Sequence, residues 1–67
     1  MSWKEWKNDL DKANRDYDAK RIDQATYITR IKYDICMISK EGNHEMAEGI
    51  AKAHAYDIKE LLNEHGR

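Results

Sequence analysis

The sequence predicts an all-α fold, a small antiparallel bundle of three helices in which self-association is expected to help complete the core. Apolar residues recur at spacings of three and four along three segments, which is the period of an α-helix. The strict alternation of a half-buried strand is absent from these segments. Pro is also absent, and the Gly42-Asn43 pair supplies one clear break between helices.

The first helix is expected at about residues 3–19. Ser2 and Glu5 have the spacing of a capping box, in which Ser2 accepts from the first free N–H groups and Glu5 reaches back to the cap. Apolar side chains then form a narrow seam on one side of the helix: Trp3, Trp6, Leu10, Ala13 and Tyr17. Because the other sides are charged, this helix has a narrower apolar surface than an ordinary amphipathic helix.

The break before the second helix contains neither Gly nor Pro, so it is predicted from capping residues. Asp23 is a favourable N-cap, and Ile22 and Tyr27 have the spacing of a hydrophobic staple. This predicts a helical hairpin with a second helix over residues 23–40. One unbroken helix over residues 3–40 is the alternative, because the segment 18–21 tolerates helix.

The second helix carries the main apolar stripe of the chain. Its members recur at helical spacing, with Ala25, Tyr27 and Cys36 at the borders: Ile28, Ile31, Ile35 and Ile38. Tyr33 and Met37 lie one turn apart on the opposite side, where packing against the first helix does not need them.

The third helix is expected at about residues 44–64. Gly42 suits the left-handed residue that ends a helix, and Asn43 suits the next N-cap. The apolar face of this helix is Ala47, Ile50, Ala51, Ile58, Leu61 and Leu62. His54 lies near the middle of that face, so it is predicted to be buried and structural, bonded to Asp57 or a Tyr hydroxyl. A pH-sensitive switch is the alternative role.

Length and composition exclude several classes of protein. The chain has 67 residues with 12 Lys and Arg against 13 Asp and Glu, which fits one domain over residues 1–67 and disfavours a general nucleic-acid coat. The single Cys excludes a disulfide scaffold, and no apolar run is long enough to span a membrane. A free Cys without a signal-peptide core predicts a cytoplasmic location, in the host cytoplasm if the chain is viral.

No residue pattern predicts an enzyme, a cofactor or a metal site. His44 and Glu48 share a helix face but lack the second His of the zinc-protease motif. Cys36 borders the apolar stripe, which favours a small hydrophobe over a nucleophile. The carboxylates are mixed with Lys and Arg, and none is expected to form a pair in an apolar setting, where the two pKa values would separate.

The favoured function is binding to a larger protein, which the chain would modulate or inhibit. Tyr33 and Met37 are the expected contact surface, with Tyr56 as an outlying member, because aromatic and Met residues are enriched in interfaces. Trp3 and Trp6 form the competing contact surface. The alternative is that these two side chains belong to the core of the bundle. The size of the chain is typical of accessory proteins of phages and mobile elements.

Two alternatives are kept. The helices joined at Gly42 resemble a helix-turn-helix regulator in arrangement, but Glu45 and Glu48 would face phosphates. A structural homo-oligomer, dimeric or higher, is the other alternative.

Overall fold

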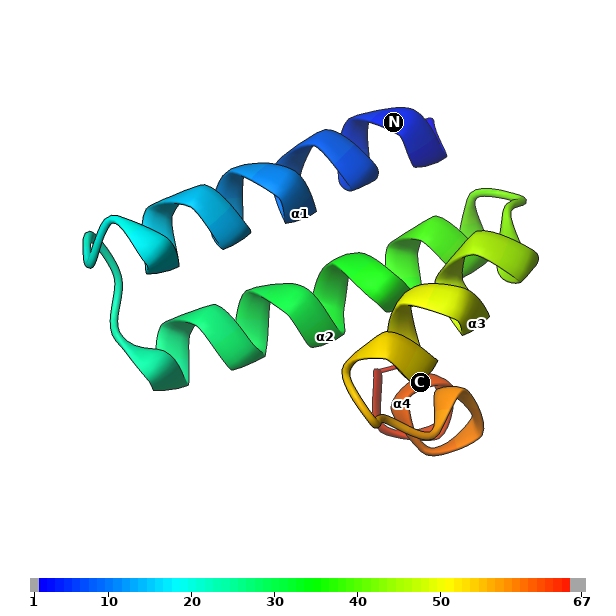
Figure 1. Cartoon of the computed structure of the whole chain (residues 1–67). Coiled ribbons are helices and arrows are strands. Elements are labelled where there is room, and N and C mark those ends of the chain that lie inside the picture. Colours follow the sequence, from blue (N-terminus) through cyan, green and yellow to red (C-terminus); the bar gives the residue numbers. More distant parts are fainter. Residues whose placement is uncertain (1, 66–67) are drawn as a thin grey trace.

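The computed structural model describes residues 2–65, and these form four α-helices without a strand (Figure 1). The helices are α1 (Trp3–Asp18), α2 (Gln24–Lys40), α3 (His44–Ala53) and α4 (Ile58–His65). The all-α class is confirmed. The number of helices was predicted wrongly, because the segment 44–64 is two helices rather than one.

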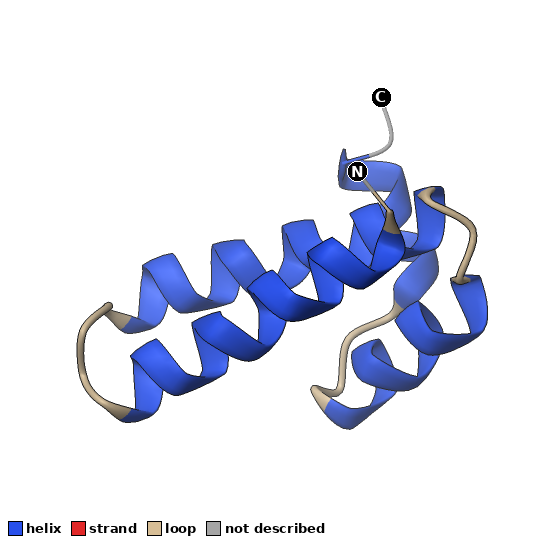
Figure 2. Cartoon of the chain, turned by 90° about the horizontal axis from the view of Figure 1, so that it is seen from above, coloured by secondary structure: helices blue, strands red, loops and turns tan. Residues whose placement is uncertain are grey.

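The helical hairpin is confirmed, since α1 and α2 run antiparallel side by side (Figures 1 and 2). The Asp23 carboxylate accepts from the Thr26 amide at 2.8 Å and caps α2 as predicted. The capping box at the start of α1 was predicted wrongly, because Ser2 occupies the N-cap position but its side chain makes no capping hydrogen bond. The chain leaves α1 through Lys20, which has a left-handed φ of 60°.

The segment after Ala53 turns sharply, which ends the helix predicted over residues 44–64. Ala55 adopts a left-handed φ of 61°, and the Tyr56 amide donates back to the Ala51 carbonyl at 2.8 Å. This is the bonding pattern of a Schellman C-cap. The Asp57 carboxylate then accepts from the Lys59 amide at 2.9 Å and begins α4. Between α2 and α3, Gly42 is likewise the left-handed residue that follows a helix, and Asn43 caps the next one, as predicted.

The core gathers around α2, which contacts each of the other helices. Three of the four Ile residues of its stripe are fully buried, whereas Ile28 is half-buried. Both ends of the predicted third helix supply core residues, although they belong to α3 and α4. The buried apolar side chains are Leu10, Ala13, Ile31, Ile35, Cys36, Ile38, Ala47, Ala51, Ile58 and Leu61.

His54 lies at the C-cap of α3 and is half-buried, so the prediction that it is a mostly buried residue in mid-helix was wrong. The break at Ala55 moves it from a helix face to a helix end. Its ring stacks on Tyr56 with centroids 5.8 Å apart and lies 6.5 Å from the ring of Tyr27. Tyr27 stacks in turn on Tyr17, so His54 joins a row of rings that ties the α3–α4 turn to the hairpin.

Candidate functional site

A groove of about 500 Å³ lies between α1, α2 and the end of α4. This volume is in the range of about 300–1,000 Å³ that is usual for ligand sites. The residues that line the groove come from all three helices: Trp6, Asp9, Thr29, Arg30, Tyr33, Asp34 and His65. It therefore combines aromatic, acidic and basic side chains on one surface.

The aromatic part of the groove consists of Trp6 and Tyr33. Their ring centroids are 5.5 Å apart and the planes meet at 76°, which is an edge-to-face contact between α1 and α2. Tyr33 is 46% exposed, so part of this aromatic pair is open to a ligand. The indole Nε1–H of Trp6 is buried and has no hydrogen-bond acceptor within residues 2–65. A buried donor without a partner is costly, which makes this N–H a candidate contact for a bound molecule.

The acidic part of the groove is the pair Asp34 and Asp9. Asp34 is only 1% exposed, and its Oδ2 has no hydrogen-bond partner among the described residues. Burial, and then the neighbouring Asp9 carboxylate, raise the pKa of Asp34 to about 8. The contact with Asp34 and the charge of Arg30 hold the pKa of Asp9 below its usual value. At neutral pH, Asp34 therefore carries the proton and Asp9 the charge.

This pair contradicts the expectation that no two carboxylates share an apolar setting. Asp34 lies three residues after Ile31 and four before Ile38, so it belongs to the buried stripe of α2. That spacing is a sequence signal for burial, and the sequence reasoning did not use it. Five residues of the groove were not predicted from the sequence: Asp9, Thr29, Arg30, Asp34 and His65.

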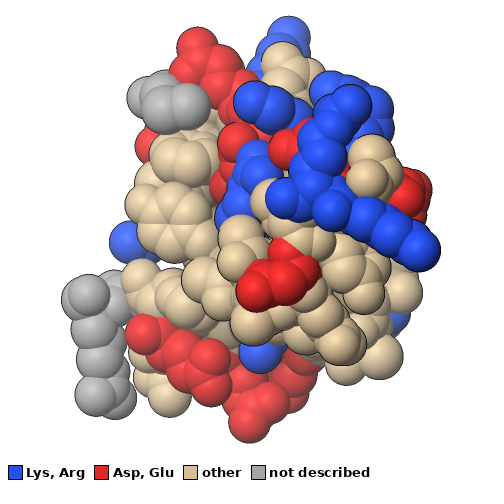
Figure 3. All heavy atoms as spheres, turned by 90° about the vertical axis from the view of Figure 1, so that its left-hand side faces the viewer, with Lys and Arg blue, Asp and Glu red and all other residues tan. Residues whose placement is uncertain are grey.

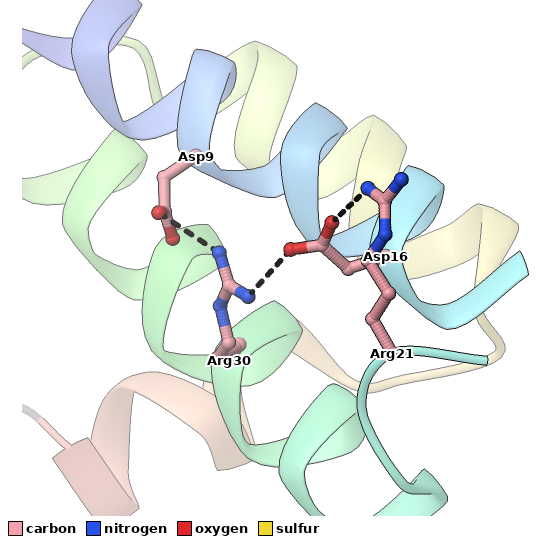
Figure 4. A network of polar contacts seen from close by, with 4 residues as sticks. All are labelled: Asp9, Asp16, Arg21 and Arg30. Carbon is pink, nitrogen blue, oxygen red and sulfur yellow. Dashed lines mark hydrogen bonds and ion pairs between the residues drawn. The ribbon is translucent and has the colours of Figure 1, made fainter. Parts of the chain in front are cut away.

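Arg30 is held by two carboxylates of α1, those of Asp9 and Asp16 (Figure 4). Its guanidinium donates to Asp9 Oδ1 at 3.0 Å through Nη2, and its Nη1 lies 3.6 Å from Asp16 Oδ2. Arg21 approaches the other oxygen of Asp16 at 3.3 Å. Both hydrogen-bonding ends of the Arg30 guanidinium thus face carboxylates of α1, and the buried Asp34 has no cation of its own.

The structure brings together only part of the predicted contact surface. Trp6 and Tyr33 line the groove, whereas Trp3 packs against the core one turn earlier on α1. Met37 is half-buried one turn beyond Tyr33 and does not line the groove. Tyr56 lies apart from them, in a second hollow of about 340 Å³ beside α3, with the ammonium of Lys32 5.2 Å from its ring centroid.

The surroundings of His44, Glu48 and Cys36 do not form a metal or nucleophile site among the described residues. His44 Nε2 lies 3.8 Å from Glu48, and residues 2–65 hold no group of three or more His, Cys, Asp or Glu placed for a metal. Cys36 is buried, its thiol lies 3.3 Å from the Leu61 carbonyl, and burial raises its pKa. A thiol with a raised pKa is a poor nucleophile.

Comparison with protein-family models, curated proteins and solved structures gives no match. None of the described helices combines the length and the apolar character that crossing a membrane requires.

Proposed function

We propose that this chain is a non-catalytic binding protein that attaches to a larger protein through the groove and thereby modulates or inhibits it. The observation that carries the proposal is the exposed Tyr33 beside Trp6, next to two buried polar atoms, Trp6 Nε1 and Asp34 Oδ2, that have no hydrogen-bond partner among residues 2–65. Interfaces favour aromatic anchors beside a few polar contacts at fixed positions.

The proposal includes Met37 as the continuation of the surface along α2. Met37 and Tyr33 lie one helical turn apart, and neither packs against the buried core cluster. Their removal is therefore expected to spare the fold. Trp3 and Trp6 pack against that cluster, so their removal is expected to reduce stability as well as binding.

A pull-down from the native cell or its host, followed by two double variants, tests the proposal. Replacing Tyr33 and Met37 by Ala is expected to weaken capture of the partner about thirtyfold, since a buried Tyr anchor contributes about 2 kcal/mol. Helicity should stay unchanged, and stability should fall only by about 1 kcal/mol, the contribution of the lost Trp6–Tyr33 edge-to-face contact. Replacing Trp3 and Trp6 by Ala is expected to lower the melting temperature.

The matched control is Tyr17→Ala, which removes an exposed Tyr of α1 outside the groove. Partner capture should survive this change. If the Tyr33 and Met37 double variant captures the partner as well as the natural chain does, the contact surface lies elsewhere and the proposal fails.

Nucleic-acid binding is the second candidate, supported by one surface. Figure 3 shows Lys and Arg gathered over the upper right of the face at the α1–α2 turn, with Asp and Glu at its upper left, near its centre and along its lower edge. The exposed carboxylates Glu45 and Glu48 on α3 argue against a helix-turn-helix mode, in which α3 would enter the major groove. A salt titration against duplex DNA tests this candidate, because phosphate contacts make affinity fall steeply with salt.

Self-association and an accessory role in a phage or mobile element remain predictions. Sedimentation of the purified chain over a range of concentrations tests the first. A dimer that dissociates when Tyr33 is replaced by Ala would identify a second copy of the chain as the partner of the groove.

A further inference from the structure

The groove holds two carboxyl groups, those of Asp9 and Asp34, beside one guanidinium and one imidazole. Arg30 is its one Lys or Arg among the described lining residues, and that guanidinium is already shared between Asp9 and Asp16. Asp34 lies beside them, is buried, and has one carboxyl oxygen, Oδ2, without a hydrogen-bond partner among the described residues. A further positive charge in the groove would find a carboxyl oxygen without a partner.

The aromatic residues of the groove suit the same ligand. An ammonium or guanidinium group is attracted to the faces of Trp and Tyr rings, and this attraction grows when the site is partly shielded from water. Trp6 and Tyr33 lie edge to face beside the acidic pair, so rings and carboxyls border one space. Aromatic faces combined with carboxylates are a recurrent way to bind alkylammonium groups.

We propose that the groove binds a cationic alkyl side chain, a lysine of the partner protein, with its ammonium between the Asp34 carboxyl and the Trp6 and Tyr33 rings. That the ligand belongs to a partner protein rests on the proposed function, whereas binding of a free alkylammonium does not depend on it. The alkyl stem of lysine lies along apolar surface while its head remains charged, which fits a groove with an apolar wall and an acidic end.

Binding of a cation should release a proton from the site. Asp34 is protonated at neutral pH because burial and Asp9 raise its pKa to about 8. Arg30 and His65 are the other titratable groups that line the groove. The ammonium favours the ionised form of Asp34, so affinity rises with pH, by up to about tenfold per unit between pH 6 and 8, and levels off above that range. A lysine ammonium stays charged throughout, since its pKa is about 10.4.

n-Butylammonium, the lysine side-chain analogue, is the probe, titrated into the full chain at constant ionic strength. Binding is followed by the NMR shifts of the two indole N–H groups. We expect saturable shifts of the Trp6 indole with a dissociation constant of about a millimolar, which is reasonable for so small a ligand. Trp3 does not line the groove, so its indole serves as the internal control.

Two comparisons make the experiment decisive. n-Butanol has the same alkyl chain without the charge and is expected to bind at least tenfold more weakly at pH 8. Asp34→Asn should weaken butylammonium binding about tenfold at pH 8 and remove its pH dependence. Asp11→Asn is the matched control, because Asp11 is a carboxylate of α1 outside the groove.

Equal binding of butanol and butylammonium would overturn the inference, and so would N-methylacetamide binding in place of the amine, which would identify a peptide carbonyl as the ligand. Absence of any Trp6 shift would overturn it too. The pH dependence of butylammonium binding to the natural chain is a second test, and it needs no variant. If butylammonium binds but the Tyr33 and Met37 double variant still captures the partner, the site stands and the proposed function fails.

Discussion

Replacing Asp34 by Asn should stabilise the chain at neutral pH. The change keeps the shape of the side chain and removes the need to hold a proton on a buried carboxyl beside Asp9. In the unfolded chain Asp34 is ionised at pH 7, whereas in the folded chain it is protonated, so folding takes up one proton. Asn has no such requirement.

The size of the effect follows from the two pKa values. The pKa of Asp34 is about 8 in the folded chain against an ordinary value of 3.8. A pH of 7 lies about three units above the ordinary pKa of Asp34. The cost of keeping Asp34 protonated in the folded chain is therefore at most about 4 kcal/mol. The groove opens to solvent on one side and screens part of this, so we expect a stabilisation of about 1–3 kcal/mol. For a chain of this size, each 1 kcal/mol raises the melting temperature by about 4–8 °C.

The pH dependence carries a definite sign. Because the pKa of Asp34 is raised, its contribution to stability is fully present below about pH 4 and is lost as the pH rises through about 8. Asp9 has a lowered pKa, is ionised in both states above pH 5 and adds no slope in that range. Between pH 5 and 7.5, the unfolding free energy of the natural chain should therefore fall by up to about 1.4 kcal/mol per unit more than that of the variant.

Urea denaturation at pH 5.0, 6.0 and 7.5 measures these differences. The control is Asp11→Asn, which removes a surface carboxylate that pairs with Lys7 at 2.7 Å. A surface pair contributes about 1 kcal/mol or less, and its loss should leave the slope unchanged. Parallel pH profiles for the natural chain and Asp34→Asn would refute the reasoning, because Asp34 would then be ionised in the folded state.

Three further predictions concern the turn residue Ala55, Gly49 within α3, and the ring of His54. Ala55→Gly should stabilise the chain by about 0.5–1 kcal/mol in urea denaturation, because Gly adopts the left-handed φ of 61° without strain. Gly49→Ala should stabilise α3 by about 1 kcal/mol in the same assay, since an added Cβ there meets no heavy atom within 4 Å; a loss of stability would contradict this. His54→Leu should change the melting temperature at pH 7.5 by less than about 8 °C, because the half-buried ring stacks but fills no core position.

The parts of the fold that were predicted correctly depend on local chemistry. Asp23 and Asn43 have side-chain oxygens that cap helices, and each accepts from the backbone amide three residues later. Gly42 has a φ of 103°, which other residues rarely adopt. The apolar period of α2 then identifies its buried face. Such features are visible in single residues and short spacings. The predicted limits of the first two helices were therefore close to those of α1 and α2.

The break between α3 and α4 was missed for a physical reason. Ala51 and Ile58 keep the helical spacing of apolar residues across the break, so the periodicity continues where the helix does not. The left-handed turn residue is Ala55, which has no intrinsic preference for that conformation. One signal was present, because Asp57 and Glu60 have the spacing of a helix start. Only tertiary packing decides between this start and a continuous helix.

The same break and the burial of Asp34 together produce the candidate site. A continuous third helix would run on straight past Ala53, whereas the turn at Ala55 redirects the chain so that His65, at the end of α4, lines the groove beside α1 and α2. Asp34 occupies a buried position in the apolar stripe of α2. An apolar residue at this position would avoid the free-energy cost of burying an ionisable group. A buried carboxyl that must hold a proton weakens a chain whose small core offers little stability to spare. Its presence beside two aromatic rings is therefore better explained by a ligand than by folding, and the opposite effects expected of Asp34→Asn on stability and on amine binding distinguish these two roles.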